Sequence, residues 1–253
     1  MIVVQEAKAL ALKLNHPNKV LSSIPAAAAL EFNGQELVVV PHKLDEVKVL
    51  RNLGIKAPSP ILHYYDWEGR FEPYEHQRMT SAFLTMHRKA LVLNEIGTGK
   101  TQSALWACDY LMKIGKVKKA LIISPLSTLE RVWGDSIFMN FPNRISVTLH
   151  GTSARRKKLL GTDADFYIIN HDGFSIIADQ AKDMFDLIIV DEAAVLRNPS
   201  TNRFKVLRRF MHQNTTTRLW LMTGTPTPND PTDAWALAKL VESPYCNKTY
   251  TAF

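Results

Sequence analysis

The amino-acid sequence predicts an α/β protein, in which a mainly parallel sheet has helices on both faces and a small α+β domain precedes it. Short apolar runs alternate with helical segments from about Phe71 onward, and this spacing is typical of a parallel sheet. The sequence before residue 57 has a different texture, and the Pro-rich stretch 57–60 marks a connection. We therefore expect an accessory domain at residues 1–60 and a larger domain at residues 71–253.

Length and composition agree with a globular chain. Its 253 residues suffice for one large or two smaller domains, and 46% of them are hydrophobic and 22% charged. We expect no membrane partner, because apolar stretches stay short of the roughly 18 residues of a span. We expect a cytoplasmic location, because no secretion signal is evident and Cys108 and Cys246 are too few for a disulfide framework. The net charge of +7 weakly favours a polyanionic partner.

Local signals predict the elements of the first domain. Residues 28–40 form a predicted hairpin around Asn33-Gly34, the preferred two-residue turn. Residues 45–53 have the periodicity of a helix, which Gly54 follows. Residues 3–14 mix strand and helix signals.

Five apolar runs predict the strands of the second domain, and a sixth run is a weaker candidate at residues 145–149. Each is short and bounded by turn or helix signals, as buried parallel strands are. The five runs are residues 90–93, 120–123, 166–169, 187–190 and 219–222.

The first of these runs leads into a loop that ends in Lys-Thr and continues as the helical pattern 102–112. In such a loop, glycines let backbone N–H groups approach phosphates, and the following helix directs the positive end of its dipole at them. Lys100 would reach the β- and γ-phosphates of ATP, and Thr101 would hold Mg²⁺. We therefore predict a nucleotide site that includes Gly97, Thr98, Gly99, Lys100 and Thr101.

The run 187–190 is followed directly by Asp191 and Glu192. A strand buried on both faces delivers such acids to the carboxyl edge of the sheet, where ligands bind in open α/β folds. Asp191 fits the Mg²⁺ partner of Thr101, and Glu192 fits the catalytic group that orients or deprotonates water. The alternative is that both acids only cap the next helix. This interpretation is the weaker one, because the same chain also contains the Lys-Thr loop.

Several motifs in order resemble the first RecA-like motor lobe of superfamily 2 nucleic-acid-dependent ATPases, specifically the Swi/Snf-type DNA translocases. The loop 94–101 is similar to Asp-Glu-x-Gly-x-Gly-Lys-Thr, with Asn94 at its first position. Residues 124–127 with Trp133 resemble a family motif in which a Trp follows a Pro at a fixed spacing. Residues 191–194 resemble the motif Asp-Glu-Ala-His, and residues 196–200 resemble the motif Leu-Lys-Asn-Pro-x-Ser. Residues 221–226 with Asn229 resemble Leu-Thr-Gly-Thr-Pro. The resemblance covers roughly residues 71–253.

The resemblance implies roles for residues that the pattern alone does not single out. Gln77 would hydrogen-bond adenine, with Tyr74 or Phe71 stacking on the base. Without the family context, an exposed helix residue is the preferred interpretation of Gln77. The nucleic-acid backbone would be contacted by Ser124, Leu126, Ser127 and His171. Such contacts position the protein on the nucleic acid without reading its base sequence. Thr223, Gly224 and Thr225 would couple ATP chemistry to movement. The basic run 155–158 is better explained as a solvated helix face, because consecutive residues on a helix point in different directions.

Two departures from the family qualify the implied activity. Ala194 stands where the family has His, which removes a polar contact between the ATP site and the coupling motif. The chain also stops at Phe253, so we expect the second lobe and its arginine finger to be missing. Because such a finger contributes about a thousandfold or more, we expect this ATP hydrolase to be weakly active or inactive in isolation.

The sequence thus favours the N-terminal half of an ATP-dependent DNA translocase or helicase with ATP and Mg²⁺ as cofactors and duplex DNA as its track. Its compact organisation resembles a phage or bacterial protein, acting in a bacterial or infected host cell. The alternative is a non-catalytic nucleotide- or nucleic-acid-binding module that a partner chain completes. A P-loop kinase of small substrates is disfavoured, because it lacks the Thr-Gly-Thr-Pro element. Polarity, strand separation and oligomeric state stay open.

Overall fold

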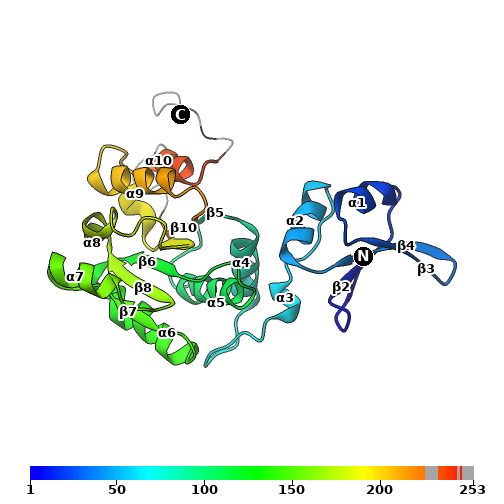
Figure 1. Cartoon of the computed structure of the whole chain (residues 1–253), viewed down its shortest axis with the longest axis horizontal. Coiled ribbons are helices and arrows are strands. Elements are labelled where there is room, and N and C mark those ends of the chain that lie inside the picture. The colour runs from blue at the N-terminus through cyan, green and yellow to red at the C-terminus, as the bar shows by residue number, and fades with distance from the viewer. Residues whose placement is uncertain (226–232, 244–245, 247–253) are drawn as a thin grey trace. The chain divides into compact units, whose positions relative to one another are not determined.

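The chain forms two compact units, Met1–Asp66 and Trp67–Phe253, in a computed structural model (Figure 1). The structure describes residues 1–225, 233–243 and 246. Neither of the two cysteines forms a disulfide in the described residues; Cys108 is buried and Cys246 is partly buried. Among the described helices, none combines the length and the apolar character that a membrane span requires.

The first unit is built on a four-stranded antiparallel sheet with the order β1-β2-β4-β3. The predicted hairpin is confirmed as β3 and β4, and its turn residues Asn33 and Gly34 both have positive φ, 49° and 70°. This is the backbone conformation that a two-residue turn with the natural twist of a hairpin requires. The strands are β1 (Ile2–Val4), β2 (Ala9–Leu12), β3 (Ala28–Phe32) and β4 (Gln35–Pro41).

Helices complete the first unit. Helix α2 (Leu44–Asn52) confirms the predicted helix and ends before Gly54, whose φ is 83°. Helix α1 (Pro17–Ser23) begins with a proline, which is tolerated in the first turn, and α3 is the single turn Ile61–Tyr64. The apolar side of α2 is buried together with residues of β2, α1 and β4, namely Leu44, Val47, Leu50, Leu10, Leu12, Val20, Val38 and Val40.

The second unit contains a six-stranded sheet with the order β5-β10-β9-β6-β8-β7, in which every pairing is parallel. All five predicted strands are confirmed within a residue at each end, and the sixth candidate is also a strand. The strands are β5 (Lys89–Val92), β6 (Ala120–Ser124), β7 (Ser146–Thr148), β8 (Phe166–Asn170), β9 (Leu187–Val190) and β10 (Arg218–Met222).

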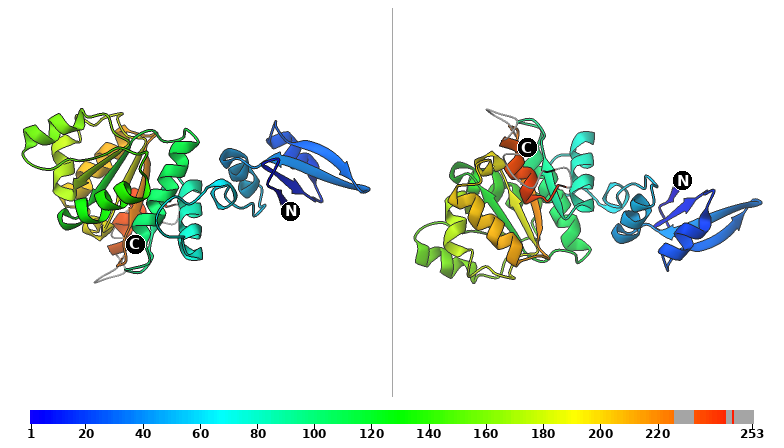
Figure 2. Two further views of the ribbon diagram at one scale, coloured as in Figure 1. Left: turned by 90° about the horizontal axis from the view of Figure 1, so that it is seen from below. Right: turned by 90° about the horizontal axis from the view of Figure 1, so that it is seen from above.

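Helices cover both faces of this sheet (Figure 2). One core joins alternate residues of the central strands to α7, α8, α9 and α10, with Phe174, Phe204 and Trp235 among the helical contributors. The other residues of the strands are also buried, and Trp220 of β10 donates to the carbonyl of His87 at the end of α4. The helices are α4 (Glu75–Met86), α5 (Lys100–Lys113), α6 (Asp135–Asn140), α7 (Ser153–Leu160), α8 (His171–Ile177), α9 (Asn202–Gln213) and α10 (Asp233–Leu240).

Three short helical turns lie between these elements. The first, η1 (Leu126–Thr128), follows β6 and continues as the π-helical turn η2 (Leu129–Gly134). The third, η3 (Ala193–Leu196), follows β9. Turns of this kind recur at functional sites, and here all three carry motif residues that the sequence singles out.

Candidate nucleotide and nucleic-acid site

Strand order brings the three predicted ATP-site motifs to one edge of the sheet. Strand β10 lies between β5 and β9, with Met222 opposite Val92 and Leu221 opposite Val190. Because all strands run in parallel, the loops after these strands leave the same edge. Neighbouring strands are about 4.8 Å apart, so the phosphate loop and Asp191 begin on strands separated by roughly 10 Å.

The phosphate loop has the backbone conformation that the sequence predicts. Gly97 and Gly99 have φ values of 82° and 77°, which side chains with a Cβ rarely adopt. Gly99 is the N-cap of α5, so the positive end of the helix dipole lies at the loop. Within the described part of the chain, the backbone N–H groups of Gly97, Gly99 and Thr101 donate to no protein acceptor. The loop therefore fits a phosphate group.

Lys100 is folded into the loop that precedes it. Its side chain is buried, and Nζ donates to the carbonyls of Asn94 and Glu95, both at 2.9 Å. Thr98 Oγ1 also donates to the carbonyl of Glu95, at 2.8 Å. These bonds close the loop around the ammonium group, which a phosphate would attract more strongly than two neutral carbonyls do.

Gln77 lies directly against the phosphate loop. Its Nε2 donates to the carbonyl of Thr98 at 3.1 Å, and its Oε1 accepts from the backbone N–H of Tyr74 at 3.0 Å, which forms the capping box of α4. A Cβ at Gly99 would lie 2.2 Å from Gln77 Nε2, so this contact also requires a glycine. Both ends of the amide are engaged within the protein, and contact with adenine stays a prediction.

An exposed aromatic pair lies beside Gln77. The rings of Tyr74 and His76 stack nearly in parallel, with centroids 5.7 Å apart and 10° between their planes. His76 Nε2 donates to the carbonyl of Thr98 at 3.1 Å, because a carbonyl can only accept. The sequence analysis named Tyr74 and Phe71 as stacking candidates and missed His76, whose only signal is its place beside Gln77 in the motif.

Asp191 is buried at the carboxyl end of β9, and both of its carboxylate oxygens are held. Trp133 Nε1 donates to Oδ2 at 3.1 Å, and the backbone N–H of Glu192 donates to Oδ1 at 3.1 Å. A carboxylate offers about four lone-pair positions, so these bonds orient the group and leave acceptor capacity for a cation. Trp133 was noted as a motif residue, but its contact with Asp191 could not be read from the sequence.

Glu192 adopts a left-handed backbone conformation, with φ 48° and ψ 49°. For a residue with a side chain this costs on the order of 1 kcal/mol, and such strain is concentrated at functional sites. Within the described residues, its carboxylate has no hydrogen-bonding or ionic partner. The strained turn therefore leaves the Glu192 carboxylate open to a ligand, and its action on water stays a prediction.

The residues at this edge fit Mg²⁺ held together with a nucleotide. The described residues include no group of three or more His, Cys, Asp or Glu side chains that could hold a metal ion alone. Mg²⁺ characteristically binds one or two protein ligands together with waters and substrate phosphates. Asp191 and the Thr101 hydroxyl match that donor set, since no described residue takes the Thr101 hydroxyl as a partner.

The predicted nucleic-acid loops leave two neighbouring strands, β6 and β8, where Ser124 lies opposite Asn170. Ser124 is fully buried, and its hydroxyl pairs with the hydroxyl of Thr128. The Ser124 hydroxyl is therefore engaged within the protein, and contact of Ser124 with nucleic acid stays a prediction. Leu126, which is 59% exposed, and Ser127 face solvent and stay predicted contacts.

His171 links the loop after β8 to Asp191. Its Nε2 donates to the backbone carbonyl of Asp191 at 2.9 Å. Burial lowers the pKa of His171, and the nearby Arg203 adds to this effect, while the bond to the Asp191 carbonyl opposes it. Beside it, Asp172 forms a bidentate pair with Arg203 at 2.6 and 2.9 Å, which lowers the pKa of Asp172. The ring of His171 thus contacts the backbone of Asp191, and its contact with nucleic acid stays a prediction.

The coupling motif packs against the phosphate loop. The N–H of Thr223 donates to the carbonyl of Val92 at 3.1 Å, and Thr223 Oγ1 accepts from the N–H of Thr225, also at 3.1 Å. A Cβ on Gly224 would lie 2.8 Å from Ile96 Cγ1 and 3.2 Å from its backbone nitrogen. Contact between these loops is what a coupling element requires. The motif residues Pro226 and Asn229 lie outside the described residues.

The basic run 155–158 on α7 divides between core and surface. Arg156 is buried, and it donates to the carbonyl of Gly151 at 2.9 Å and to Asn170 Oδ1 at 2.7 Å. The other three side chains are exposed. Arg156 therefore supports the loop after β8 from within, as expected of consecutive residues that point in different directions.

Together, the parallel sheet, the glycine-containing loop before α5 and the acids after β9 define a P-loop lobe of the RecA-like type. The SNF2-related domain matches residues 42–252, and the chain belongs to this family. The match begins within the first compact unit and includes every motif residue named above.

Two curated relatives show the range of similar proteins. The chain is 33% identical over 181 residues to the ISWI chromatin-remodeling complex ATPase ISW1 of Saccharomyces cerevisiae, covering 67% of this chain and 15% of that protein. It is 27% identical over 195 residues to the putative protein p41 of Acyrthosiphon pisum secondary endosymbiont phage 1, covering 72% of this chain and 42% of that protein. The chain thus spans less than half the length of either relative.

A solved structure shares the fold. The SWI2/SNF2 ATPase core of Sulfolobus solfataricus in complex with dsDNA superposes with a TM-score of 0.60 at 20% identity. The match covers 74% of this chain and 39% of that one. It supports the RecA-like fold of the second unit.

Proposed function

We propose that this chain is a motor lobe of an ATP-dependent DNA translocase, which binds Mg-ATP and couples its hydrolysis to movement along DNA. The observation that carries the proposal is the convergence of the phosphate loop, Asp191 and the Thr223–Gly224–Thr225 loop at one edge of the sheet. A relic without nucleotide chemistry would have no physical need for a buried Asp191 held by Trp133 beside a glycine-lined phosphate loop.

The proposed chemistry divides among these side chains. Bound Mg²⁺ would offset the negative charge of the transferred phosphoryl group. Lys100 would bind the β- and γ-phosphates, while Thr101 and Asp191 would hold the ion. Glu192 would orient or deprotonate the attacking water. Gln77 would hydrogen-bond adenine once its amide releases the carbonyl of Thr98. The backbone N–H groups of Gly97, Thr98 and Gly99 would surround the phosphates.

We propose duplex DNA as the track, because a solved member of the family is a complex with dsDNA. The loops after β6 and β8 would contact its backbone through Leu126, Ser127 and the N–H groups beside His171. We also propose that a second RecA-like lobe, in the same polypeptide or another, supplies the other wall of the ATP cleft. Hydrolysis would then depend on closure of the two lobes around ATP.

The first test is ATP binding with Mg²⁺, followed by turnover with duplex DNA, single-stranded DNA, RNA or no polymer. Lys100→Ala should weaken ATP binding by about tenfold to a hundredfold, because it removes charge-assisted bonds to phosphate. Lys158→Ala, on the exposed face of α7, is the matched control and should bind as the unmodified chain does. Equal ATP affinity of the Lys100 variant and the control would refute the assignment of the site.

A further inference from the structure

Helix α9 carries a basic stripe whose function the ATP site does not explain. Lys205, Arg208, Arg209 and His212 recur at intervals of three and four residues, which places them on one face of the helix. The opposite face is buried in the core through Phe204, Leu207, Phe210 and Met211. The stripe therefore faces away from the sheet.

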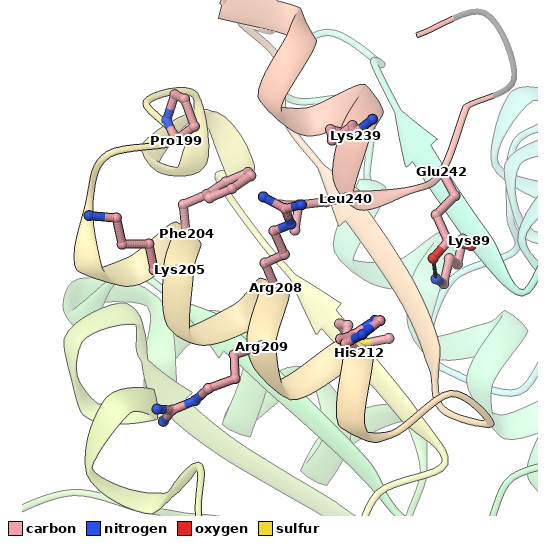
Figure 3. Close-up of a pocket in the computed structure, with 11 residues that line it drawn as sticks. Lys89, Pro199, Phe204, Lys205, Arg208, Arg209, His212, Lys239, Leu240 and Glu242 are labelled. Carbon is pink, nitrogen blue, oxygen red and sulfur yellow. Dashed lines mark ion pairs between the residues drawn. The ribbon is translucent and has the colours of Figure 1, made fainter. Parts of the chain in front are cut away.

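This stripe forms one side of a cavity of about 540 Å³ (Figure 3). Lys239 of α10 and Lys89, the first residue of β5, add two further ammonium groups to the lining. Glu242 is the single acid among the lining residues in the described part of the chain. We call this cavity the basic pocket, and its volume lies in the range typical of ligand sites, about 300–1,000 Å³.

The positive charge of the basic pocket is only partly neutralised within the protein. Lys89 pairs with Glu242, and Arg209 pairs with the exposed Asp179 at 3.1 Å. In the described part of the chain, Lys205 and Arg208 have no carboxylate within ion-pairing distance. Like charges one helical turn apart repel each other, so the bare stripe opposes helix formation unless an anion binds to it.

The basic pocket is distinct from the proposed nucleotide site. Lys89 begins β5, whereas the phosphate loop follows the other end of the same strand. The pocket extends from Lys89 to Pro199, a residue that follows η3. None of the residues assigned to ATP, Mg²⁺ or nucleic acid lines it.

The lining favours a peptide over a nucleic-acid duplex. Pro199 is partly exposed among the basic groups, and the nearly fully buried side chains of Phe204 and Leu240 form the floor of the pocket beneath them. Figure 3 shows the Phe204 ring directed toward Arg208 and Leu240. A stiff duplex would contact the rim of the pocket through its phosphates and would make no contact with the apolar floor. A peptide can insert an apolar side chain and offer carboxylates, which match the planar fork of Arg208.

We propose that the basic pocket binds an acidic peptide segment of a partner protein, in which Asp and Glu residues flank one large apolar residue. The carboxylates pair with Lys205, Arg208 and Lys239, and the apolar residue lies between α9 and α10.

The proposal is tested by fluorescence anisotropy of a labelled synthetic peptide with Asp and Glu on both sides of a Leu, titrated with the full chain. The double variant Lys205→Glu, Arg208→Glu should weaken binding at least about tenfold, since two attractive charges become repulsive. Lys239→Glu tests the facing helix and should also weaken binding. The matched control is Lys157→Glu, Lys158→Glu on α7, which makes the same charge change on another exposed face and should leave peptide affinity near that of the unmodified chain.

Specificity is tested with three further probes. Replacing the peptide's Leu by Ser should weaken binding, and the double variant should lower affinity for duplex DNA and for inorganic polyphosphate by much less than it lowers affinity for the peptide. ATP binding should also be unchanged, which separates this proposal from that of the ATP site. The proposal is wrong if the peptide does not bind, if the double variant binds it as the control does, or if duplex DNA or polyphosphate loses as much affinity as the peptide.

Discussion

At the scale of single residues, Asp191 is the point where three segments meet. Trp133 and the Glu192 N–H hold its carboxylate, and His171 holds its backbone carbonyl. A buried carboxylate held in this way has a fixed direction, and outer contacts of this kind tune how well a ligand binds a metal. The site is therefore organised around Asp191 before any nucleotide binds.

Trp133→Phe tests this organisation, because it keeps an aromatic ring and removes only the N–H donor to Asp191. We expect the Mg²⁺ concentration needed for ATP binding to rise by about tenfold, with little change in global stability. Trp106→Phe is the matched control, since the Trp106 N–H donates to the carbonyl of Glu68, away from the site. A Mg²⁺ titration of ATP binding decides the outcome, and superimposable curves for the two variants would contradict the role of Trp133.

His171→Ala tests whether the nucleic-acid loop acts on the ATP site through the carbonyl of Asp191. ATP affinity should change little, while stimulation of turnover by duplex DNA should fall by up to about tenfold, the scale of one lost hydrogen bond. His171→Gln keeps a donor and should recover part of the stimulation. The measurement is turnover against DNA concentration with the second lobe supplied. Stimulation that survives in the Ala variant would show that coupling takes another route.

At the scale of elements, the loop after β10 and the loop after β5 behave as one packed pair. The close approach of Gly224 to Ile96 leaves no room for a Cβ, so neither loop can move far without the other. This contact gives a physical basis for coupling even though Ala194 lacks the family's polar side chain.

Gly224→Ala should therefore displace the phosphate loop and weaken ATP binding by several-fold, about 1 kcal/mol. Gly161→Ala is the matched control, because its Cβ would lie no closer than 3.4 Å to the Lys158 carbonyl. In the background Ile96→Ala the side-chain clash disappears and only the backbone contact remains, so the loss should be smaller. Titration of each variant with ATP measures the effect, and unchanged affinity of Gly224→Ala would disprove the packing argument.

At the scale of the whole molecule, the first compact unit contains a buried histidine that ties its stability to pH. In the first unit, buried His42 donates from Nε2 to the carbonyl of Pro58 and accepts at Nδ1 from the Tyr64 hydroxyl, both at 3.0 Å. Burial lowers the pKa of His42 below 6.5, and the nearby His63 also lowers it, while the bond to Pro58 opposes these effects. Folding thus disfavours protonation of the His42 ring.

Because the unfolded chain then binds more protons than the folded one, the first unit should lose stability as the pH falls below about 6.5. The loss should grow until the pH passes the lower, folded-state pKa. Hydrogen exchange of β2 and β4 amides in the full chain, measured between neutral and mildly acidic pH, reports the first unit separately. His42→Gln should flatten the pH dependence, whereas His16→Gln, at the N-cap of α1, should not. If stability still falls with pH in the His42 variant, the pH dependence arises from other titratable groups.

Local patterns alone determined much of this protein. Six strands, the hairpin at Asn33-Gly34 and the phosphate loop follow from periodicity and turn chemistry, because each depends on residues a few positions apart. The ordered motifs likewise indicated the family, and the family match confirmed it. The particular roles of Gln77 and the nucleic-acid residues stay predictions.

Only the tertiary structure decided what these local pieces touch. It placed β10 between β5 and β9, buried Ser124, turned His171 toward Asp191, and brought Trp133 to a carboxylate 58 residues away. It also gathered Lys89, α9 and Lys239 around one pocket. Such contacts depend on strand order and on packing across the sheet, where many pairings satisfy the same local pattern and only the combined burial of the core selects one.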